Sequence, residues 1–205
     1  DMDLFNNDYI AAVENTLNIL LENEDLSDYK IVTSIPIDQT FLRNITFPFN
    51  DINKITTAIP FEAEESIPYP IEQVIMDFQT IPTDGKENGK VILAALDKEY
   101  LKSLIEIFNK YNLYPVFTGI ESNSTLRCYE YFNSVIDETI LQIDIGNKKT
   151  VVNIVKDSSL LYTRSISSGV EKLIKATSSL LNITLNDART IIESLDLDIT
   201  SFESN

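Results

Sequence analysis

The sequence predicts an α/β fold with a mixed sheet, and three observations support this prediction. Segments whose apolar residues recur at helical spacing alternate with short apolar runs of strand length. The last third of the chain places three such runs in succession and follows them with two helical segments. Of the 205 residues, 43% are hydrophobic, which is enough to fill the core of one large domain or two small ones.

The first fifty residues predict one helix and two strands. Apolar residues at helical spacing indicate a helix over residues 8–22. The run "YKIVTSIP" predicts a buried strand that ends at Pro36, and "QTFLRNITFPF" alternates partly as far as Pro48.

A second helix is expected to follow Asp51, a good N-cap residue, with Ile52, Ile55 and Ile59 on one side. Pro60 lies inside this pattern, where it would remove a backbone donor and crowd the preceding turn. We therefore expect a kink or a short interruption and two helical pieces, the second containing "FEAEES".

The middle of the chain predicts a hairpin, then a helix, a strand and a helix. The runs "EQVIMDFQTI" and "KVILAALD" form the hairpin strands, joined by the polar loop "PTDGKENG". A helix with one apolar stripe spans residues 98–112, "LYPVFTGIE" returns as a strand, and a helix runs from Ser122 to about Val135. Cys128, the only cysteine, lies in an apolar-periodic stretch and is expected to be buried.

The last third predicts three strands and two helices. The strands are "TILQIDIG", "TVVNIVKD" and "LLYTRSIS", and the helices begin near Ser168 and Thr184. Thr184 and Asp187 have the Ser/Thr-x-x-Asp/Glu spacing that caps a helix start.

Composition excludes several classes of function. The chain has 32 acidic and 16 basic residues, a net charge of -16 and no histidine. Binding to nucleic acid or to anionic lipid headgroups requires clustered Lys and Arg, and the sequence contains no such cluster. The lack of histidine removes Ser-His-Asp and Cys-His catalysis and histidine metal ligation. No apolar run approaches the roughly 20 residues that span a bilayer, so we expect no direct membrane insertion by this segment.

Two sets of residues indicate a family. Three strands followed by a helix, with Asp144 and Gly146 ending the first strand and Arg164 and Gly169 preceding the helix, resemble the unit on which actin, hexokinase and heat-shock chaperone folds are built. The upstream stretch resembles the type IV pilus protein PilM and the cytoplasmic domain of the type II secretion protein GspL. The matching upstream residues are Arg43, Pro48, Phe49, Ile52, Pro60, Phe61, Glu62, Glu64, Pro68 and Asp77. The Phe-Pro-Phe at 47–49 and the Ile-Pro-Phe-Glu at 59–62 favour the GspL side over the PilM side.

This resemblance, which runs from about Val13 to Leu195, implies an α/β, actin-like (ribonuclease H-like) fold that is partial and carries an inserted small α+β subdomain. The implied domains are a partial first actin-like domain at 1–43 plus 114–136, the inserted subdomain at 44–113, and the start of a second actin-like domain at 137–205. The family opens with its own Asp-x-Gly strand unit, which this sequence does not contain, so we expect the chain to be a fragment.

The function that the resemblance implies is a non-enzymatic scaffold or adaptor on the cytoplasmic side of the bacterial inner membrane. It would link the secretion or pilus assembly ATPase to other inner-membrane platform proteins, and a homodimer is a further partner that the family allows. No catalytic residue, no metal site and no cofactor are expected.

The alternative function is an ATP-binding, PilM-like adaptor whose partner binding depends on nucleotide and Mg²⁺. In nucleotide-binding relatives the Asp at the position of Asp144 orients a metal-bound water, the Gly at Gly146 lets the backbone approach phosphate oxygens, and a hydroxyl such as that of Thr150 adds a donor. These three residues are the cofactor-binding set only if nucleotide is bound. The competing interpretation is a strand-to-strand turn whose Gly-Asn pair supplies positive φ. A filament protein of the cell-division FtsA type is a third, weaker alternative.

Three further groups of residues have structural interpretations. Glu62, Glu64 and Glu65 lie close together in sequence but on different helical faces, which predicts a solvated acidic face rather than a metal site. Arg43 and Arg164 lie on predicted strands and are taken as structural. The aromatic residues that flank prolines are expected to pack beneath the second helix: Phe47, Phe49, Phe61 and Tyr69.

Overall fold

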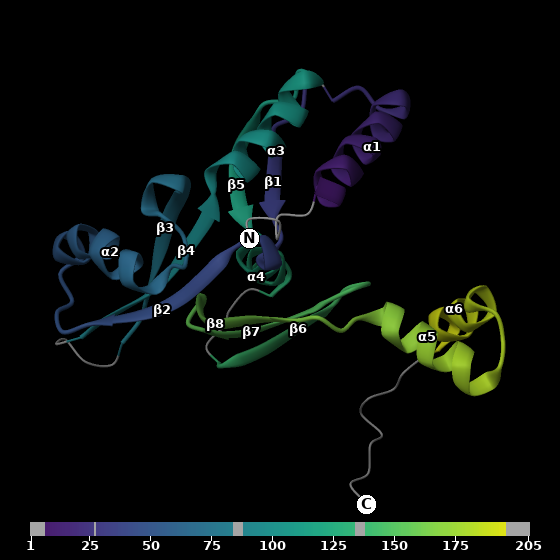
Figure 1. Ribbon diagram of the computed structural model, residues 1–205. Coiled ribbons are helices and arrows are strands. Elements are labelled where there is room, and N and C mark those ends of the chain that lie inside the picture. The colour runs from purple at the N-terminus through teal and green to yellow at the C-terminus, as the bar shows by residue number, and fades with distance from the viewer. Residues whose placement is uncertain (1–6, 27, 84–87, 134–137, 196–205) are drawn as a thin grey trace, which may run out of the picture. The chain divides into compact units, whose positions relative to one another are not determined.

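The computed structural model describes residues 7–26, 28–83, 88–133 and 138–195 (Figure 1). These residues form two compact units, one containing residues 7–142 and 153–163 and the other containing residues 143–152 and 164–195. The domain limits expected from the sequence stay predictions, as do the parts of the expected helix to Val135 and of the hairpin loop that lie outside the described residues.

The elements follow the predicted order of helices and strands. They are α1 (Asn7–Asn23), β1 (Ile31–Ile35), β2 (Phe41–Phe47), α2 (Ile52–Ser66), β3 (Val74–Ile81), β4 (Gly89–Asp97), α3 (Lys98–Lys110), β5 (Pro115–Ile120), α4 (Glu121–Phe132), β6 (Ile140–Ile145), β7 (Thr150–Lys156), β8 (Ser159–Ile166), α5 (Val170–Leu181) and α6 (Leu185–Ser194), with short 3-10 turns at Ile37–Gln39 and Ile71–Gln73.

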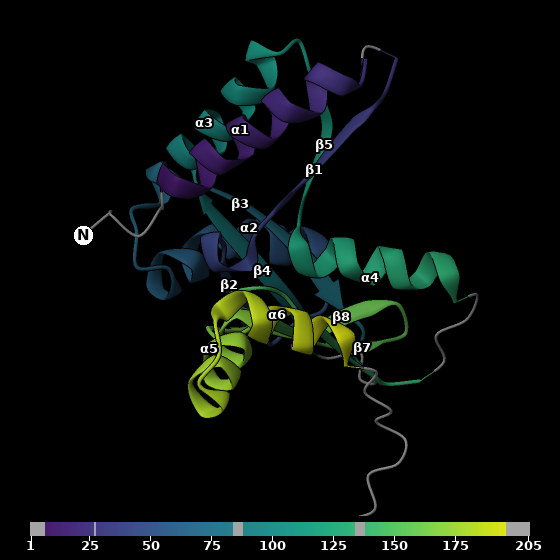
Figure 2. The ribbon, with the colours of Figure 1, turned by 90° about the vertical axis from the view of Figure 1, so that its right-hand side faces the viewer.

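Strands β1 and β5 form a two-stranded parallel sheet, and helices α1 and α3 share a core with it. Figures 1 and 2 both place α1 and α3 side by side. Their shared core includes Leu17 of α1, Ile35 of β1 and Leu104 of α3. Asp97 is the N-cap of α3, and its carboxylate accepts from the backbone N–H of Tyr100 at 2.8 Å, so one of the free donors of the helix is satisfied.

The second sheet is antiparallel, in the order β2-β4-β3, and β4 is its central strand. Alternate residues of β4 point to opposite faces, as the strand period requires. Val91, Leu93 and Ala95 join the core beneath α2. Ile92 and Leu96 belong to the cores on the other face. The central strand is therefore buried on both sides, which explains its nearly continuous apolar sequence.

Helix α2 covers one face of this sheet as a single helix of 15 residues with Pro60 inside it. The expectation of two helical pieces is wrong. Pro60 lies on the exposed side, where the carbonyl of Thr56, one turn earlier and also exposed, can turn to water. The buried side of the helix carries Ile55, Ile59 and Ala63, whose burial holds the helix together across the proline. Asp51 caps the helix as predicted, accepting from the N–H of Asn53 at 2.9 Å.

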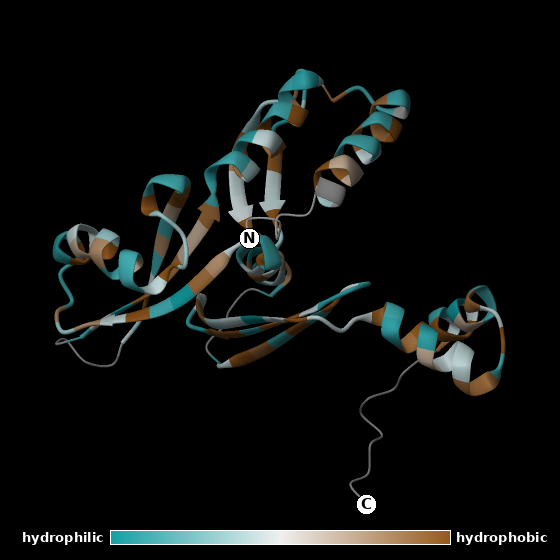
Figure 3. Ribbon diagram, in the orientation of Figure 1, coloured by the Kyte–Doolittle hydropathy of each residue, from teal (hydrophilic) through white to brown (hydrophobic). Residues whose placement is uncertain are grey.

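Three of the four proline-flanking aromatics pack in the core beneath α2: Phe47, Phe49 and Tyr69. The prediction that Phe61 packs in this core is wrong, because its side chain is 70% exposed on the outer side of the helix. Cys128 is also exposed, contrary to expectation. Helix α4 buries Ser122 and Leu126, and Cys128 lies about 200° around the helix from Leu126. Figure 3 shows how hydrophobic and hydrophilic residues alternate around the helices.

A third sheet has the order β6-β7-β8. A chain of hydrogen bonds within the first unit joins it to α4. The Ser122 and Thr163 hydroxyls lie 2.7 Å apart, and Thr163 donates to the Asn153 side-chain oxygen at 2.7 Å. The Asn153 amide donates to Gln142, whose own amide donates to the backbone carbonyl of Thr125. Ser122 and Asn153 are fully buried, so this network satisfies polar groups that would otherwise be costly to bury.

The second unit contains the helical hairpin α5–α6. Asn182 ends α5 in the left-handed conformation at φ 51°. Thr184 caps α6 as predicted, because its hydroxyl accepts from the N–H of Asp187 and donates to that residue's carboxylate.

Replacing Pro60 with alanine is expected to raise the free energy of unfolding by about 1–2 kcal/mol. Alanine restores the hydrogen bond to the Thr56 carbonyl and has a much higher helix propensity, whereas proline offsets part of its cost by restricting the unfolded chain. Urea denaturation followed by circular dichroism measures the change. Glu64→Ala, on an exposed position of the same helix, is the control and is expected to stay within about 0.5 kcal/mol of the unmodified protein. Equal midpoints for the two variants would contradict this account of Pro60.

Candidate functional site

The loop after β6 contains the residues that the sequence singled out, and it lies within the second unit. Asp144 is half-buried near the end of β6. The N–H of Gly146 donates to the carbonyl of Lys149 at 2.9 Å, which closes the turn. The Thr150 hydroxyl donates to the carbonyl of Ser168 at 2.7 Å, which ties β7 to the segment that leads into α5. The Thr150 hydroxyl, which was proposed as a phosphate donor, and the N–H of Gly146 therefore both donate to the protein's own backbone.

The same loop also satisfies the start of α5. The N–H of Val170 donates to the Gly146 carbonyl at 3.0 Å, and the N–H of Glu171 donates to the Asn147 carbonyl at 2.9 Å. Free N–H groups at a helix start are the usual anion-binding donors. Here the N–H groups of Val170 and Glu171 already donate to the carbonyls of the turn, so they are not free to bind an anion.

Gly169 permits this close approach. A Cβ atom at this position would lie 2.4 Å from the Gly146 carbonyl oxygen and 2.5 Å from that of Asn147. Its backbone is extended, with φ near -146°, so the requirement is space and not an unusual φ. The prediction that a Gly-Asn pair supplies positive φ is wrong, because no described glycine has positive φ. The β7–β8 turn uses positive φ instead, at Asp157 and Ser158.

The first turns of α5 carry an exposed ion pair. Lys175 donates to the Glu171 carboxylate one turn earlier, and this hydrogen bond, with the attraction of the Lys175 charge, lowers the pKa of the Glu171 carboxyl. The pair lies on the helix surface and adds little to stability.

The other sequence candidates are dispersed on the surface. Glu62, Glu64 and Glu65 are all exposed on α2, and the described residues contain no group of carboxylates, Cys or His that could hold a metal ion. Arg43 lies over the Phe41 ring at 4.3 Å from the centroid, and Arg164 is exposed on β8. Both positions are consistent with the structural interpretation.

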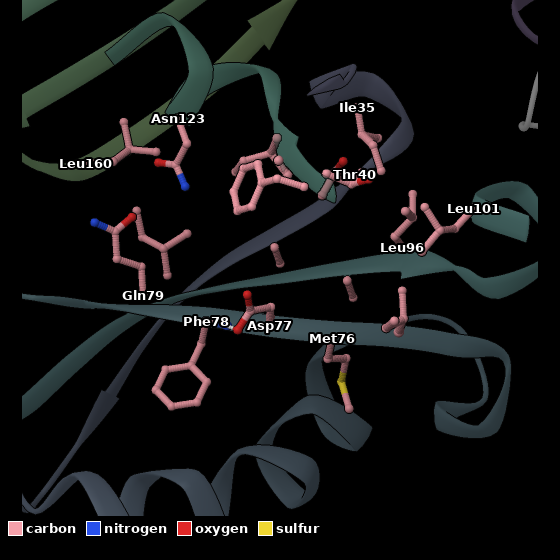
Figure 4. Close-up of a pocket in the computed structure, with 18 residues that line it drawn as sticks. Ile35, Thr40, Met76, Asp77, Phe78, Gln79, Leu96, Leu101, Asn123 and Leu160 are labelled. Atoms are coloured by element: carbon pink, nitrogen blue, oxygen red, sulfur yellow. Dashed lines mark hydrogen bonds between the residues drawn. The ribbon is translucent and has the colours of Figure 1, made fainter. Parts of the chain in front are cut away.

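A cavity of about 420 Å³ in the first unit was not predicted from the sequence (Figure 4). Its floor is the face of the second sheet that α2 does not cover. Three cross-strand pairs build this floor: Ile75 opposite Leu96, Asp77 opposite Ala94, and Gln79 opposite Ile92. Figure 4 shows Asp77 and Gln79 on the cavity side of β3 and Met76 and Phe78 on the other side, where they pack in the core beneath α2.

The opposite wall comes from β5 and the start of α4, including Phe117, Gly119 and Asn123. Residues on the wall and the floor are at least 21 positions apart in the sequence, the shortest separation being from Leu96 to Phe117, so no local pattern connects them. One signal could have been noticed. The strand sequence "IMDFQ" places a carboxylate and an amide on the same face, which is unusual for a strand that packs against a core on that face.

Replacing Gly169 with alanine is expected to lower the free energy of unfolding by about 2 kcal/mol or more. The added methyl group must push the turn away from α5 and break the hydrogen bonds from Val170 and Glu171. Thermal denaturation gives the loss of stability, and faster hydrogen exchange at the start of α5 locates it. Ser167→Ala, at an exposed neighbouring position, serves as the control. A Gly169→Ala protein as stable as this control would disprove the close packing of the turn on the helix.

Within the part of the chain that the structure describes, no helix is both long enough and apolar enough to span a bilayer.

Several solved structures are similar to this chain, and two of them belong to pilus and secretion systems. The first, a PilM–PilN type IV pilus biogenesis complex, matches at 25% sequence identity with a TM-score of 0.72, over 90% of this chain and 56% of that one. The second is the cytoplasmic domain of EpsL, an inner-membrane component of the type II secretion system of Vibrio cholerae. It matches at 11% identity with a TM-score of 0.52, over 80% of this chain and 60% of that one. This chain therefore spans a little over half the length of each.

These similarities confirm the partial actin-like α/β fold that the resemblance implied. They also correct the expectation that the chain lies on the GspL side of the resemblance and not on the PilM side. The pilus structure is closer than the secretion structure in both identity and TM-score, so the short Phe-Pro-Phe and Ile-Pro-Phe-Glu matches were misleading. The family model of the type IV pilus assembly protein PilM matches residues 5–200. The chain belongs to the PilM family of type IV pilus assembly proteins.

Proposed function

We propose that this chain is a non-enzymatic adaptor on the cytoplasmic side of the bacterial inner membrane, where it joins the pilus assembly ATPase to proteins of the membrane platform. A PilN-like protein is the platform partner that we assign to the cavity, because one similar structure is a PilM–PilN complex. The location, the ATPase and the absence of catalysis follow from the family resemblance and are parts of the same proposal.

The cavity is the observation that carries this proposal. Protein interiors are packed without large voids, so a space of about 420 Å³ beside a sheet face is a candidate binding site. Its lining is mostly apolar, with a few polar side chains such as Asp77, Gln79 and Asn123. That combination is typical of sites in which apolar contacts supply affinity and a few polar groups fix orientation.

The loop after β6 supports an adaptor that does not depend on nucleotide. The Gly146 N–H and the Thr150 hydroxyl donate to backbone carbonyls, and so do the N–H groups of Val170 and Glu171 at the start of α5. A phosphate group would have to displace these internal bonds. We therefore interpret Asp144, Gly146 and Thr150 as residues with a structural role in the turn between β6 and β7.

Filling the cavity is expected to weaken the binding of a PilN-type protein from the same organism at least tenfold. Ala94 lies in the middle of the cavity floor, and Ala94→Phe places a ring where the bound segment would lie. Calorimetry with the full-length protein measures the dissociation constant. Lys54→Phe, which adds the same ring to an exposed position of α2, is the matched control and is expected to leave binding unchanged. Equal affinities for the two variants would place the partner elsewhere.

The same pair of variants tests whether the protein has a second partner surface. An adaptor must hold its two partners on separate surfaces, so binding of the purified assembly ATPase is expected to be unaffected by Ala94→Phe. If the ATPase gives no heat of binding at tens of micromolar, the link to the ATPase is wrong, whatever the result for PilN.

About 1 mM Mg-ATP is expected to raise the melting temperature of the full-length protein by less than about 1 °C, because the loop donors are already engaged. A ligand that saturates a site a hundredfold above its dissociation constant would add about 2.7 kcal/mol and be readily detected. An increase of several degrees that disappears in Asp144→Ala would instead favour the ATP-binding adaptor.

A further inference from the structure

The outer side of helix α2 carries an exposed aromatic ring. Phe61 is 70% exposed, whereas the buried side of the helix carries Ile55, Ile59 and Ala63. Phe61 lies about 160° around the helix from Ile59, so its ring points away from the sheet that α2 covers and adds nothing to the core. A single exposed apolar residue is common on protein surfaces, so the groups around the ring decide whether it has a role.

Two carboxylates flank this ring. Glu64 and Glu65 follow Phe61 by three and four positions, so they are its neighbours on the helix surface, and helical side chains lean toward the N-terminus, which brings both toward the ring. Both residues are exposed, and no ion pair of either one occurs among the described residues. The last turn of α2, in which they lie, has no basic residue, so their charges oppose the helix dipole. A positively charged partner group would relieve this repulsion.

Pro60 leaves a backbone acceptor free beside these carboxylates. Proline has no N–H, so the carbonyl of Thr56 receives no hydrogen bond from position 60. Thr56 and Pro60 are both exposed, and Pro60 precedes Glu64 by one turn, so the free carbonyl and this carboxylate lie along one exposed strip of the helix. The proline and the opposed end charges both weaken α2 at positions that do not serve its core. Local rules broken in this way are typical of functional surfaces.

We propose that the outer side of α2, formed by Phe61, Glu64, Glu65 and the carbonyl of Thr56, is a docking surface for a basic segment of a protein partner. An apolar side chain of that segment covers the Phe61 ring. Its Lys or Arg side chains face the two carboxylates and donate to the Thr56 carbonyl. The negative charge of this surface repels nucleic acids and anionic lipids, which is why the occupant is a protein.

This inference rests on the proposed function, because it assigns a surface to the second partner of the adaptor, the assembly ATPase. The floor of the cavity is the face of the second sheet that α2 does not cover. The sheet therefore lies between the cavity and the outer side of α2, and the two partners can be held at the same time.

Calorimetry with the purified assembly ATPase from the same organism and the full-length protein tests the role of the ring. Phe61→Ala is expected to raise the dissociation constant at least tenfold, as truncation of a central interface aromatic commonly does. Phe132→Ala removes a similarly exposed ring, 76% exposed on α4, and is expected to leave the constant unchanged. Equal dissociation constants for the two variants would overturn the inference.

Reversing the two flanking charges tests the electrostatic part. The double variant Glu64→Lys, Glu65→Lys is expected to weaken ATPase binding at least tenfold and to remove most of its dependence on salt. Glu22→Lys, Glu24→Lys makes the same change in net charge at the exposed end of α1 and is expected to weaken binding less than twofold. Equal losses in the two double variants would mean that only the net charge matters, and would overturn the docking surface.

Pro60→Ala separates binding from folding. Alanine supplies an N–H to the Thr56 carbonyl and so removes the free acceptor. ATPase binding is therefore expected to weaken about two- to tenfold, the effect of one hydrogen bond, although the variant is more stable. A loss of affinity together with a gain in stability cannot result from misfolding. Unchanged affinity would overturn the assignment of this carbonyl to the surface.

The outcomes distinguish this inference from the proposed function. ATPase binding that neither Phe61→Ala nor the reversal at Glu64 and Glu65 weakens keeps the adaptor and overturns the docking surface. No detectable binding of the ATPase at tens of micromolar overturns both. If Phe61→Ala weakens binding of the PilN-type protein and leaves ATPase binding unchanged, the surface belongs to the platform partner and the inference is overturned.

Discussion

The burial of β4 on both faces constrains the rest of the first unit. Val91, Leu93 and Ala95 require an apolar cover on one side, and α2 provides it. Ile92 and Leu96 require cover on the other side, where two separate cores meet the sheet. These cores reach the second face only at its ends, and Ala94 between them is too small to draw any element close. The cavity follows from this distribution of side-chain volume, because a small residue at the centre of the strand leaves the floor open.

The position of β4 also determines which strand edge is available. Since β2 and β3 occupy its two sides, each of them presents an outer edge. The edge of β2 lies close to β8, where Asn44 donates to the carbonyl of Leu161 at 2.9 Å. Residues Ile75 to Gln79 of β3 line the cavity instead. Natural proteins usually protect such edges with charge or with a covering element. On β3, the carboxylate of Asp77 provides such a charge.

The sequence predicted the elements of this fold much better than it predicted how residues face one another. Periodicity located the helices and strands, and Asp51 and Thr184 were recognised as caps because capping is a local interaction. Pro60 was misjudged, because whether an exposed proline breaks a helix depends on the tertiary contacts of the residues around it. Cys128 and Phe61 were assigned to the core from their residue types, yet both lie on the outer sides of their helices. The cavity could not be predicted, because its floor and wall come from strands that no short-range pattern relates.

The loop after β6 illustrates why a motif can indicate a fold without indicating its chemistry. In this chain the turn after β6 packs tightly on the start of α5, and the glycine before the helix is needed for that packing. Gly169 meets this requirement by leaving space for the carbonyls of Gly146 and Asn147. Those carbonyls accept from the N–H groups of Val170 and Glu171, so the loop satisfies two of the donors at the start of α5 without a ligand. A phosphate-binding loop needs the opposite arrangement, with its donors left free. The same residues therefore suit either role, and what distinguishes the two roles is the direction in which the backbone groups point.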